Sequence, residues 1–379
     1  MTIEIFENAL IVREDAIHHG WVAVSDGRIA EIGEGRAPER GHDLAGDYLM
    51  PGLVELHTDH IESHALPRPR VNWHTLAAVV AYDAQIAASG ITTVFDSLRV
   101  GSDPDGGMTG PGPVALADAV ATARAEGLLR AEHRTHLRCE VCAADALTAT
   151  EAFLAKHPVH LMSLMDHTPG DRQFRDISKW KIYFGGKGGL SEPELQTLIT
   201  TRKAFHAENH DRHRAALVNI ARDRSIVIAS HDDTTLEHVA EARRDGIAIA
   251  EFPTTVEAAR ASHEAGMDVM MGAPNVVRGG SHSGNVAAEA LARDGLLDIL
   301  SSDYVPASLL MGAFELHRLI EGYSLARAIR LVSRQPALAA GLPDRGAIEV
   351  GLRADLIHVH KVGELPVVRS VWRDGKRVS

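Results

Sequence analysis

The sequence predicts an α/β protein: a (β/α)8 barrel with a small β-sandwich domain formed by both chain ends. Three observations lead to this prediction: strands and helices alternate through the middle of the chain, short strands fill both ends, and polar residues follow the middle strands. The 379 residues suffice for one large domain and one small one. A hydrophobic content of 45% and a charged content of 24% are typical of a globular enzyme.

Both chain ends consist of short predicted strands separated by turns. Short strands separated by turns fill the first fifty residues and return near residue 346, and Asp26-Gly27 and Asp374-Gly375 are typical of tight hairpins. We therefore expect residues 1–50 and 346–379 to form the sandwich together, and residues 51–345 to form the barrel.

The middle of the chain alternates apolar strands with amphipathic helices. The predicted strands are 53–57, 91–96, 136–141, 160–166, 225–230, 247–251, 268–272 and 298–302. Ser191 with Glu194, Thr234 with Glu237, and Thr254 with Glu257 predict N-terminal capping boxes of three of the helices. Eight such units joined by right-handed crossovers favour a closed barrel. The alternative is an open doubly wound sheet, but no Gly-x-Gly-x-x-Gly follows the first strand.

Charge and composition argue against several function classes. The net charge of −12 disfavours general binding to nucleic acids or acidic membranes, and it would repel a polyanionic substrate unless metals or local cations intervene. The acidic start, the lack of a membrane-length apolar run and the low cysteine content predict a cytoplasmic location. Cys139 and Cys142 have the C-x-x-C spacing, but a strand would turn them to opposite faces and the chain has no second cysteine pair, so the motif does not predict a redox or zinc site formed by this pair.

The first predicted barrel strand leads into a dense polar run. His57 and Asp59 lie two residues apart, so on a continuing strand both side chains leave the same face. An imidazole and a carboxylate that converge at a strand end form half of a site for a divalent metal. An isolated His-x-Asp would more simply be an exposed strand end, but other acidic and histidine residues crowd around this one.

Further candidate ligands follow the other strands. In a barrel, catalytic groups gather at the carboxyl ends of the strands. Each candidate has a plainer explanation: Glu140 as an ion-pair partner, His167 as a loop residue, or Asp232 and Asp233 as helix caps. Their recurrence at corresponding strand ends favours one site. The expected metal ligands are His57, Asp59, Glu140, His167, His231 and Asp303.

This residue set suits hydrolysis assisted by one or two divalent ions. Two ions about 3.5–4 Å apart can activate a water and polarise a carbonyl or phosphoryl oxygen. Glu140 is the expected bridging carboxylate, and Asp303 is the expected catalytic base, which would bind metal and accept the proton of the attacking water. The mixture of imidazoles and carboxylates favours Zn²⁺, with Mn²⁺ as the alternative.

Two segments could bind an anion. Lys187 lies in a glycine-rich segment that could expose backbone N–H groups, although a solvated loop explains it equally well. The segment after the seventh strand carries hydrogen-bond donors and glycines before a helix begins, which predicts a phosphate site. Its donors are Asn275, Arg278, Ser281, His282 and Asn285.

The chain also resembles a known family. Pro51-Gly52-Leu53-Val54-Glu55-Leu56-His57-Thr58-Asp59 is similar to the opening motif of the amidohydrolase superfamily, with Asp59 in place of its second histidine. Together with 90–96, 164–170, 230–233, 272–285 and 302–306, it resembles the PhnM branch, the diphosphatases of the carbon–phosphorus lyase pathway. The chain lacks the strand-four lysine of the superfamily, and strand six ends in Glu251 rather than the usual histidine, so His167 could replace that histidine.

The resemblance implies metal-dependent hydrolysis of alpha-D-ribose 1-methylphosphonate 5-triphosphate to the 5-phosphate and pyrophosphate. The expected partner is this small molecule, with no nucleic acid and no membrane, and the sequence permits a homodimer. The alternative activity is hydrolysis of a C–N bond in a small cyclic amide, as in a dihydroorotase-like enzyme or a deaminase, although the donor-rich segment argues against a neutral substrate. A non-catalytic scaffold is a third alternative, and the retained candidate ligands argue against it.

Overall fold

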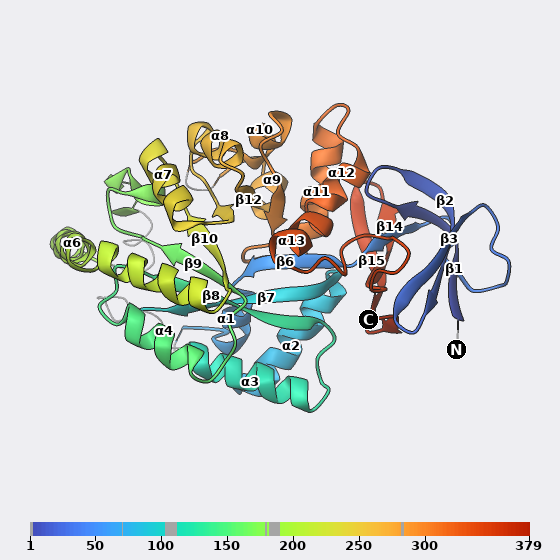
Figure 1. Cartoon of the computed structure of the whole chain (residues 1–379), viewed down its shortest axis with the longest axis horizontal. Coiled ribbons are helices and arrows are strands. Elements are labelled where there is room, and N and C mark those ends of the chain that lie inside the picture. Colours follow the sequence, from blue (N-terminus) through green and yellow to red (C-terminus); the bar gives the residue numbers. More distant parts are fainter. Residues whose placement is uncertain (1–2, 70, 103–111, 179, 182–189, 282–283) are drawn as a thin grey trace.

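A computed structural model describes residues 3–69, 71–102, 112–178, 180–181, 190–281 and 284–379. Its centre is a parallel sheet with the strand order β13-β12-β11-β10-β9-β8-β7-β6 (Figure 1). The strands are β6 (Leu53–Thr58), β7 (Ile91–Val100), β8 (Glu132–Glu140), β9 (Leu161–Met165), β10 (Val227–His231), β11 (Ile249–Glu251), β12 (Asp268–Gly272) and β13 (Ile299–Ser301). Each predicted barrel strand is confirmed, with ends shifted by a few residues.

The sheet closes where β6 meets β13. Thr58 and Asp303 form a parallel bridge, and the Asp303 N–H donates to the His57 carbonyl at 3.1 Å. The buried Glu55 carboxyl spans the same seam, because it accepts from the His57 N–H at 2.6 Å and from the Ser302 N–H at 2.5 Å. Burial raises the pKa of Glu55 to about 8, although both hydrogen bonds oppose the shift.

Helices surround the barrel. They are α1 (His60–Ala65), α2 (Thr75–Ala88), α3 (Pro113–Ala125), α4 (Ala146–Leu154), η1 (Arg172–Phe174), α6 (Glu192–Asp223), α7 (Leu236–Asp245), α8 (Val256–Glu264), α9 (Ala273–Val277), α10 (Ala288–Arg293), α11 (Ser308–Leu319), α12 (Leu325–Arg330) and α13 (Arg334–Ala339).

One predicted capping box is confirmed and the other two are wrong. The N-cap of α8 is Thr255 rather than Thr254. Ser191 and Glu194 cap α6 as expected. The N-cap of α7 is Thr235, whose side chain accepts from the His238 N–H. The predicted cap, Thr234, is buried and instead shares a hydrogen bond of 2.8 Å with the Thr254 hydroxyl.

The two chain ends build one separate, mainly antiparallel sheet, so the predicted fold class is confirmed (Figure 1). Its order is β16-β15-β14-β5-β1-β2-β3, with β4 beside β1. The strands are β1 (Ile3–Val12), β2 (Ile17–Ser25), β3 (Arg28–Glu34), β4 (His42–Asp43), β5 (Tyr48–Pro51), β14 (Leu356–Val362), β15 (Leu365–Arg373) and β16 (Lys376–Arg377). Phe6, Leu49 and Trp372 belong to its own apolar core. The domain boundaries at residues 51 and 345 stay predictions.

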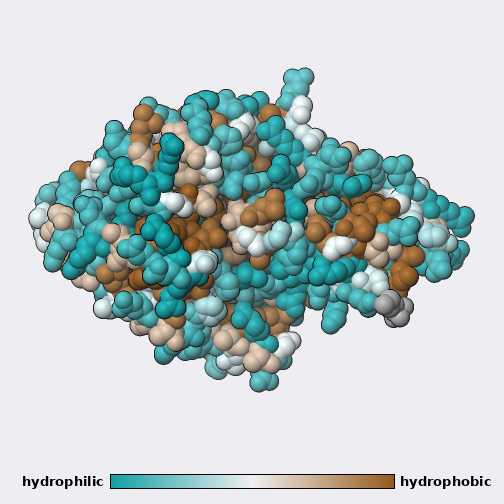
Figure 2. Space-filling view, in the orientation of Figure 1, coloured by the Kyte–Doolittle hydropathy of each residue, from teal (hydrophilic) through white to brown (hydrophobic). Residues whose placement is uncertain are grey.

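The surface in Figure 2 is mostly hydrophilic, with hydrophobic side chains in scattered patches over the barrel and over the chain-end sheet. Among the described residues, no helix is long and apolar enough to cross a membrane.

An ion-pair cluster around Glu132 joins the barrel to the C-terminal segment. Glu132, at the start of β8, accepts from Arg345 at 2.7 Å and from Arg353. Arg345 is buried and also donates to Thr93 of β7 at 3.0 Å. Desolvation opposes the charged form of Glu132, but the two guanidinium groups outweigh it and lower its pKa to about 2.

We predict that Glu132→Gln lowers the free energy of unfolding by about 1–2 kcal/mol near neutral pH, since charged hydrogen bonds are replaced at a partly exposed site. Because the folded-state pKa lies below its ordinary value of 4.5, the contribution of Glu132 is complete above pH 4.5 and is lost as the pH falls toward 2. Urea denaturation across this pH range should therefore show the two proteins converging in acid. Glu151→Gln, an exposed residue of α4, is the control. A stability difference that stays constant with pH would contradict the assignment.

Candidate active site

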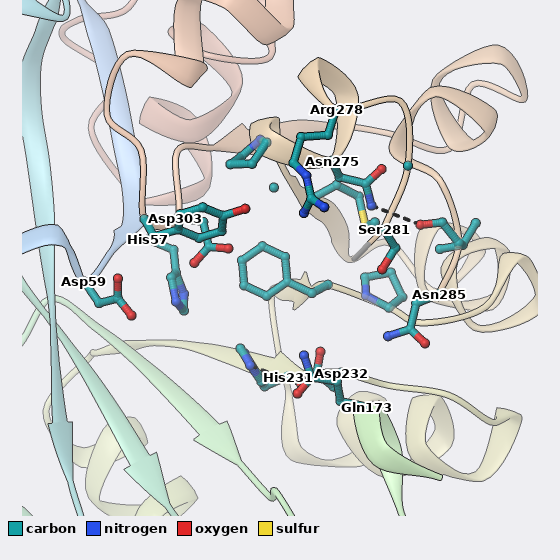
Figure 3. A pocket seen from close by; sticks show the side chains of 18 of the residues that line it. His57, Asp59, Gln173, His231, Asp232, Asn275, Arg278, Ser281, Asn285 and Asp303 are labelled. Atoms are coloured by element: carbon teal, nitrogen blue, oxygen red, sulfur yellow. Dashed lines mark hydrogen bonds and ion pairs between the residues drawn. The ribbon is translucent and has the colours of Figure 1, made fainter. Parts of the chain in front are cut away.

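A cavity of about 530 Å³ opens at the carboxyl ends of the barrel strands (Figure 3). Its walls come from segments that follow different strands, so residues far apart in sequence face one space. The polar lining residues include His57, Asp59, Arg138, His167, Gln173, His231, Asp232, Asn275, Arg278, Ser281, Asn285, Asp303 and Tyr304.

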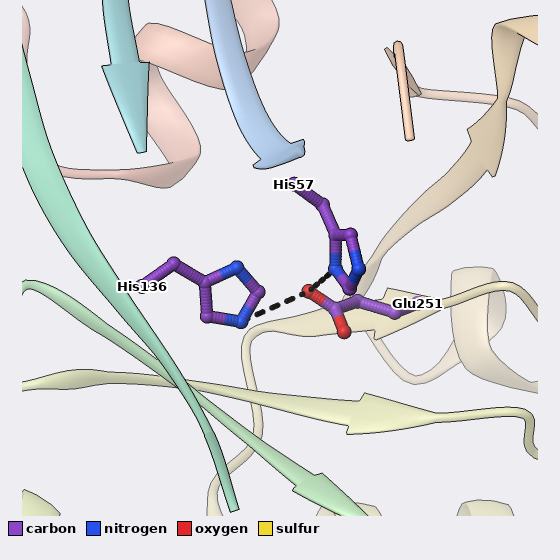
Figure 4. A group of neighbouring side chains, drawn as sticks. All are labelled: His57, His136 and Glu251. Carbon is purple, nitrogen blue, oxygen red and sulfur yellow. Dashed lines mark ion pairs between the residues drawn. The ribbon is translucent and has the colours of Figure 1, made fainter. Parts of the chain in front are cut away.

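A buried polar group that includes the lining residue His57 joins three strands (Figure 4). The Glu251 carboxylate is 3.3 Å from His57 Nδ1 and 3.6 Å from His136 Nε2, measured to the same oxygen. All three side chains are buried, and His136 Nε2 also lies 2.5 Å from the Ser163 hydroxyl. Atoms of these three side chains are close enough together to hold one metal ion.

A second group of potential ligands faces the cavity beside the first. His167, His231 and Asp232 also bring ligand atoms close enough for one ion. His231 joins the two groups, because its Nδ1 is 3.0 Å from Glu251 and its Nε2 is 3.3 Å from Asp232. Glu251 thus lies between His57 and His231 and presents a different oxygen to each.

The protonation states of His136 and Glu251 suit metal binding. Burial lowers the pKa of His136 to about 3, so its imidazole is neutral and keeps a lone pair. Burial alone would raise the pKa of Glu251, but the adjacent His57 and His136, together with a hydrogen bond from His231, hold it well below the ordinary range. Burial, followed by the charge of Asp59, raises the pKa of Asp303.

Several buried polar atoms at the site have no hydrogen-bond partner among the described residues. They include His57 Nδ1, Glu251 Oε1 and Asp232 Oδ2. They make ion-pair contacts instead: His57 Nδ1 lies 3.3 Å from Glu251 Oε1, and Asp232 Oδ2 lies 3.3 Å from His231 Nε2. Buried polar atoms are normally hydrogen-bonded, so nitrogen and carboxylate atoms that converge in this way suit the binding of a cation.

The backbone adopts a left-handed conformation just after three of the strands. Asp232, Phe252 and Asp303 have φ angles of 57°, 54° and 55°, and they follow β10, β11 and β13. This region is unfavourable for residues other than glycine, and such strain often gathers at functional sites. The Phe252 ring packs edge-on against His57 and His231, with centroid distances of 5.0 and 5.4 Å. The strained turns therefore place side chains on the wall of the cavity.

The structure brings most of the expected ligands together. His57, Asp59, His167, His231 and Asp303 all line the cavity. Asp59 is paired with Arg138 at 3.1 Å, which the sequence did not suggest.

Glu140 is the exception, because it does not line the cavity. Its carboxylate lies 2.7 Å from His167 Nδ1 and 3.2 Å from Arg99 Nε. The bridging position expected for Glu140 therefore does not fit these contacts. The contacts suit a residue that orients the His167 ring.

The donor-rich segment reaches the cavity, but one donor serves a different purpose. Asn275, Arg278, Ser281 and Asn285 line the cavity. Asn275 donates to the Val286 carbonyl at 3.2 Å and accepts from the Ala288 N–H at 3.0 Å (Figure 3). It therefore holds the loop and occupies the start of α10, where we had expected a phosphate. Lys187 and His282 lie outside the described residues.

His136, Arg138 and Glu251 were missed as site residues. A signal existed for the first two, since they alternate with Glu140 on β8 and therefore share its face. Glu251 was noticed only as the absence of a histidine at the end of strand six. The position at the end of strand six is itself the signal, because a carboxylate can take the place of an imidazole as a metal ligand.

Comparisons with known proteins agree with the site geometry. The profile described as Amidohydrolase family matches residues 84–379. The alpha-D-ribose 1-methylphosphonate 5-triphosphate diphosphatase of Escherichia coli (strain K12) is 45% identical over 377 residues, covering 99% of this chain and 100% of that protein. A D-hydantoinase of Ralstonia pickettii is 36% identical over 95 residues, only 24% of this chain and 19% of the hydantoinase.

Solved structures of low sequence identity support the fold alone. The N-isopropylammelide isopropylaminohydrolase from Burkholderia multivorans ATCC 17616 has a TM-score of 0.66 at 17% identity and covers 100% of this chain and 98% of its own. The N-acetyl-D-glucosamine-6-phosphate deacetylase from Mycobacterium smegmatis has a TM-score of 0.63 at 17% identity, with 99% and 100% covered. The resemblance inferred from the motifs is confirmed: this chain belongs to the amidohydrolase family, in the branch that includes the Escherichia coli diphosphatase.

Proposed function

We propose that this protein hydrolyses alpha-D-ribose 1-methylphosphonate 5-triphosphate to the 5-phosphate and pyrophosphate, using one or two divalent metal ions. The full-length similarity to the Escherichia coli diphosphatase carries the proposal. The hydantoinase similarity covers only a quarter of the chain, so the C–N hydrolase alternative is not favoured.

The described residues fit a pair of metal positions. His57, His136 and Glu251 would hold one ion, and His167, His231 and Asp232 would hold the other. Glu251 replaces Glu140 as the proposed bridging carboxylate, since its two oxygens face His57 and His231. Bound ions would polarise a phosphoryl oxygen and lower the pKa of a water. The ligand set suits Zn²⁺, with Mn²⁺ as the alternative.

The charge of the cavity itself favours metals. The acidic lining residues are Asp59, Asp232 and Asp303, whereas the arginines are Arg138 and Arg278. Because Arg138 is paired with Asp59, Arg278 is left to face two carboxylates. A triphosphate would be repelled by this lining, and divalent ions would reverse the sign of the local field.

Residues on two walls of the cavity would bind the phosphates and activate water. Arg278, Ser281 and Asn285 bind the distal phosphates on one wall, while Asp303 and His57 lie on the opposite wall (Figure 3). Water forms a new bond to the phosphorus next to ribose, Asp303 accepts the proton, and the bond from this phosphorus to the bridging oxygen breaks. Pyrophosphate leaves with that oxygen and its electron pair.

We predict that the metal-reconstituted protein releases pyrophosphate from the ribosyl triphosphate and little from ATP, as followed by phosphorus NMR. In water enriched in oxygen-18, the label should enter the ribosyl 5-phosphate, because water attacks the phosphorus next to ribose. Asp303→Asn should slow turnover by about 10²–10⁴-fold through loss of the base.

Asp303→Asn also serves as the control for contaminating phosphatases, provided that its metal content and circular dichroism are measured alongside. Label in pyrophosphate would move the attack to the next phosphorus. Near-normal turnover by Asp303→Asn would contradict its role as the base. A metal-loaded protein that does not hydrolyse the ribosyl triphosphate would overturn the proposed substrate.

We predict that Glu251→Gln and Glu140→Gln separate the two candidate bridging carboxylates. Glu251→Gln should lose bound metal, because the charge shared by two positions disappears. Glu140→Gln should keep its metal content and lose only part of its activity, because the His167 ring is less firmly oriented. Elemental analysis of both variants after identical purification checks this, and the reverse pattern would restore Glu140 as the bridge.

We predict that Arg278→Met lowers kcat/KM for the triphosphate by about 10–100-fold, the effect of losing a charge-assisted hydrogen bond to phosphate. Metal content should not change, since Arg278 is not a proposed metal ligand. Arg243→Met, an exposed residue of α7, is the matched control. An equal effect of the two substitutions would show that Arg278 does not contact the phosphates.

A further inference from the structure

Four potential metal ligands lie near one another around Asp166, which directly precedes His167. They are Cys142, which follows β8, Asp166, which follows β9, and His206 and His210, one turn apart on α6. Ligand atoms of Cys142, Asp166 and His206 are close enough together to hold an ion. The His206 and His210 rings stack at a centroid distance of 4.8 Å, so both histidines turn toward the same place.

The separations between the ligand atoms resemble those around zinc. The Cys142 sulfur is 3.6 Å from His206 Nδ1. The nearest Asp166 oxygen is 2.8 Å from His206 Nδ1 and 3.9 Å from His210 Nε2. Tetrahedral zinc, with bonds of about 2.3 Å to sulfur and about 2.0 Å to nitrogen or oxygen, sets its ligands about 3.3–3.5 Å apart. Cys142, Asp166 and His206 are therefore close to such a shell, and His210 would have to move toward them to complete it.

We propose that Cys142, Asp166, His206 and His210 hold a structural zinc ion, separate from the metals of the active site. One thiolate, two imidazoles and one carboxylate are ligand types that zinc prefers, and four protein ligands leave no open position for substrate. The proposal does not rest on the proposed substrate.

The position of this site suggests what the ion would stabilise. The four ligands come from α6 and from the segments after β8 and β9, so an ion would cross-link these three parts. Asp166 directly precedes His167, and it already holds the turn by accepting from the Thr168 N–H at 2.9 Å. A small cavity lined by Cys142, Thr168, Glu140 and His167 lies between the two sites.

Cobalt substitution tests this proposal without any activity measurement. A thiolate bound to Co²⁺ gives a near-ultraviolet charge-transfer absorption, and none of the described residues that line the active-site cavity is a cysteine. The chain has two cysteines, and the other one, Cys139, is fully buried with its sulfur 3.6 Å from the Thr150 hydroxyl. The absorption would therefore report on Cys142 alone.

We predict that the cobalt-loaded full-length protein shows this absorption, that Cys142→Ser abolishes it, and that Cys139→Ser keeps it. Cys142→Ser should also contain one zinc fewer per chain after purification without chelator, and His210→Ala should weaken the absorption. The spectrum of the unaltered protein decides the question even where a variant fails to fold. A cobalt-loaded protein without the absorption, or an absorption that persists in Cys142→Ser, would overturn the proposal whatever the substrate proves to be.

Discussion

The closure of the barrel at Glu55 is the constraint on which the site depends. One buried carboxyl accepts the backbone N–H groups of His57 and Ser302, so it joins the first strand to the last. The Asp303 N–H then donates to the His57 carbonyl across the same seam. A candidate ligand and the candidate base, nearly 250 residues apart in sequence, are thereby fixed side by side by backbone contacts. Backbone placement of this kind gives the precision that a catalytic constellation needs.

Glu251 is a second buried carboxylate that connects different strands of the barrel. It contacts histidines from three different strands, His57, His136 and His231, and it also accepts from the Ser163 hydroxyl at 2.7 Å. A buried carboxylate is costly unless its neighbours compensate it, and each of these neighbours is itself polar and buried. The group is therefore interdependent: removing one member leaves the others unsatisfied, which makes the interior of the barrel a preorganised cation site.

The sequence could predict what depends on neighbours along the chain, and it failed where the answer depends on partners across the barrel. The strands, and the polar residues that follow them, are local features, so His57, His231 and Asp303 were identified from the pattern. Glu140 and Glu251 both end strands, and only the packed barrel shows that the first pairs with His167 while the second points inward. The prediction of Thr234 as a helix cap was wrong for the same reason, because its hydroxyl shares a hydrogen bond with the Thr254 hydroxyl, which follows the next barrel strand.

The ends of β8 and β9 show how one pair of strands can serve two sites. Glu140 pairs with His167 beside the cavity, whereas Cys142, two residues later, lies near His206 of α6. In the same way His167 faces the cavity, while its neighbour Asp166 pairs with His206. Asp166 and His167 are adjacent in the chain, so a single peptide unit joins the residue that pairs with α6 to the residue that lines the cavity. The end of β9 therefore fixes both contacts at once.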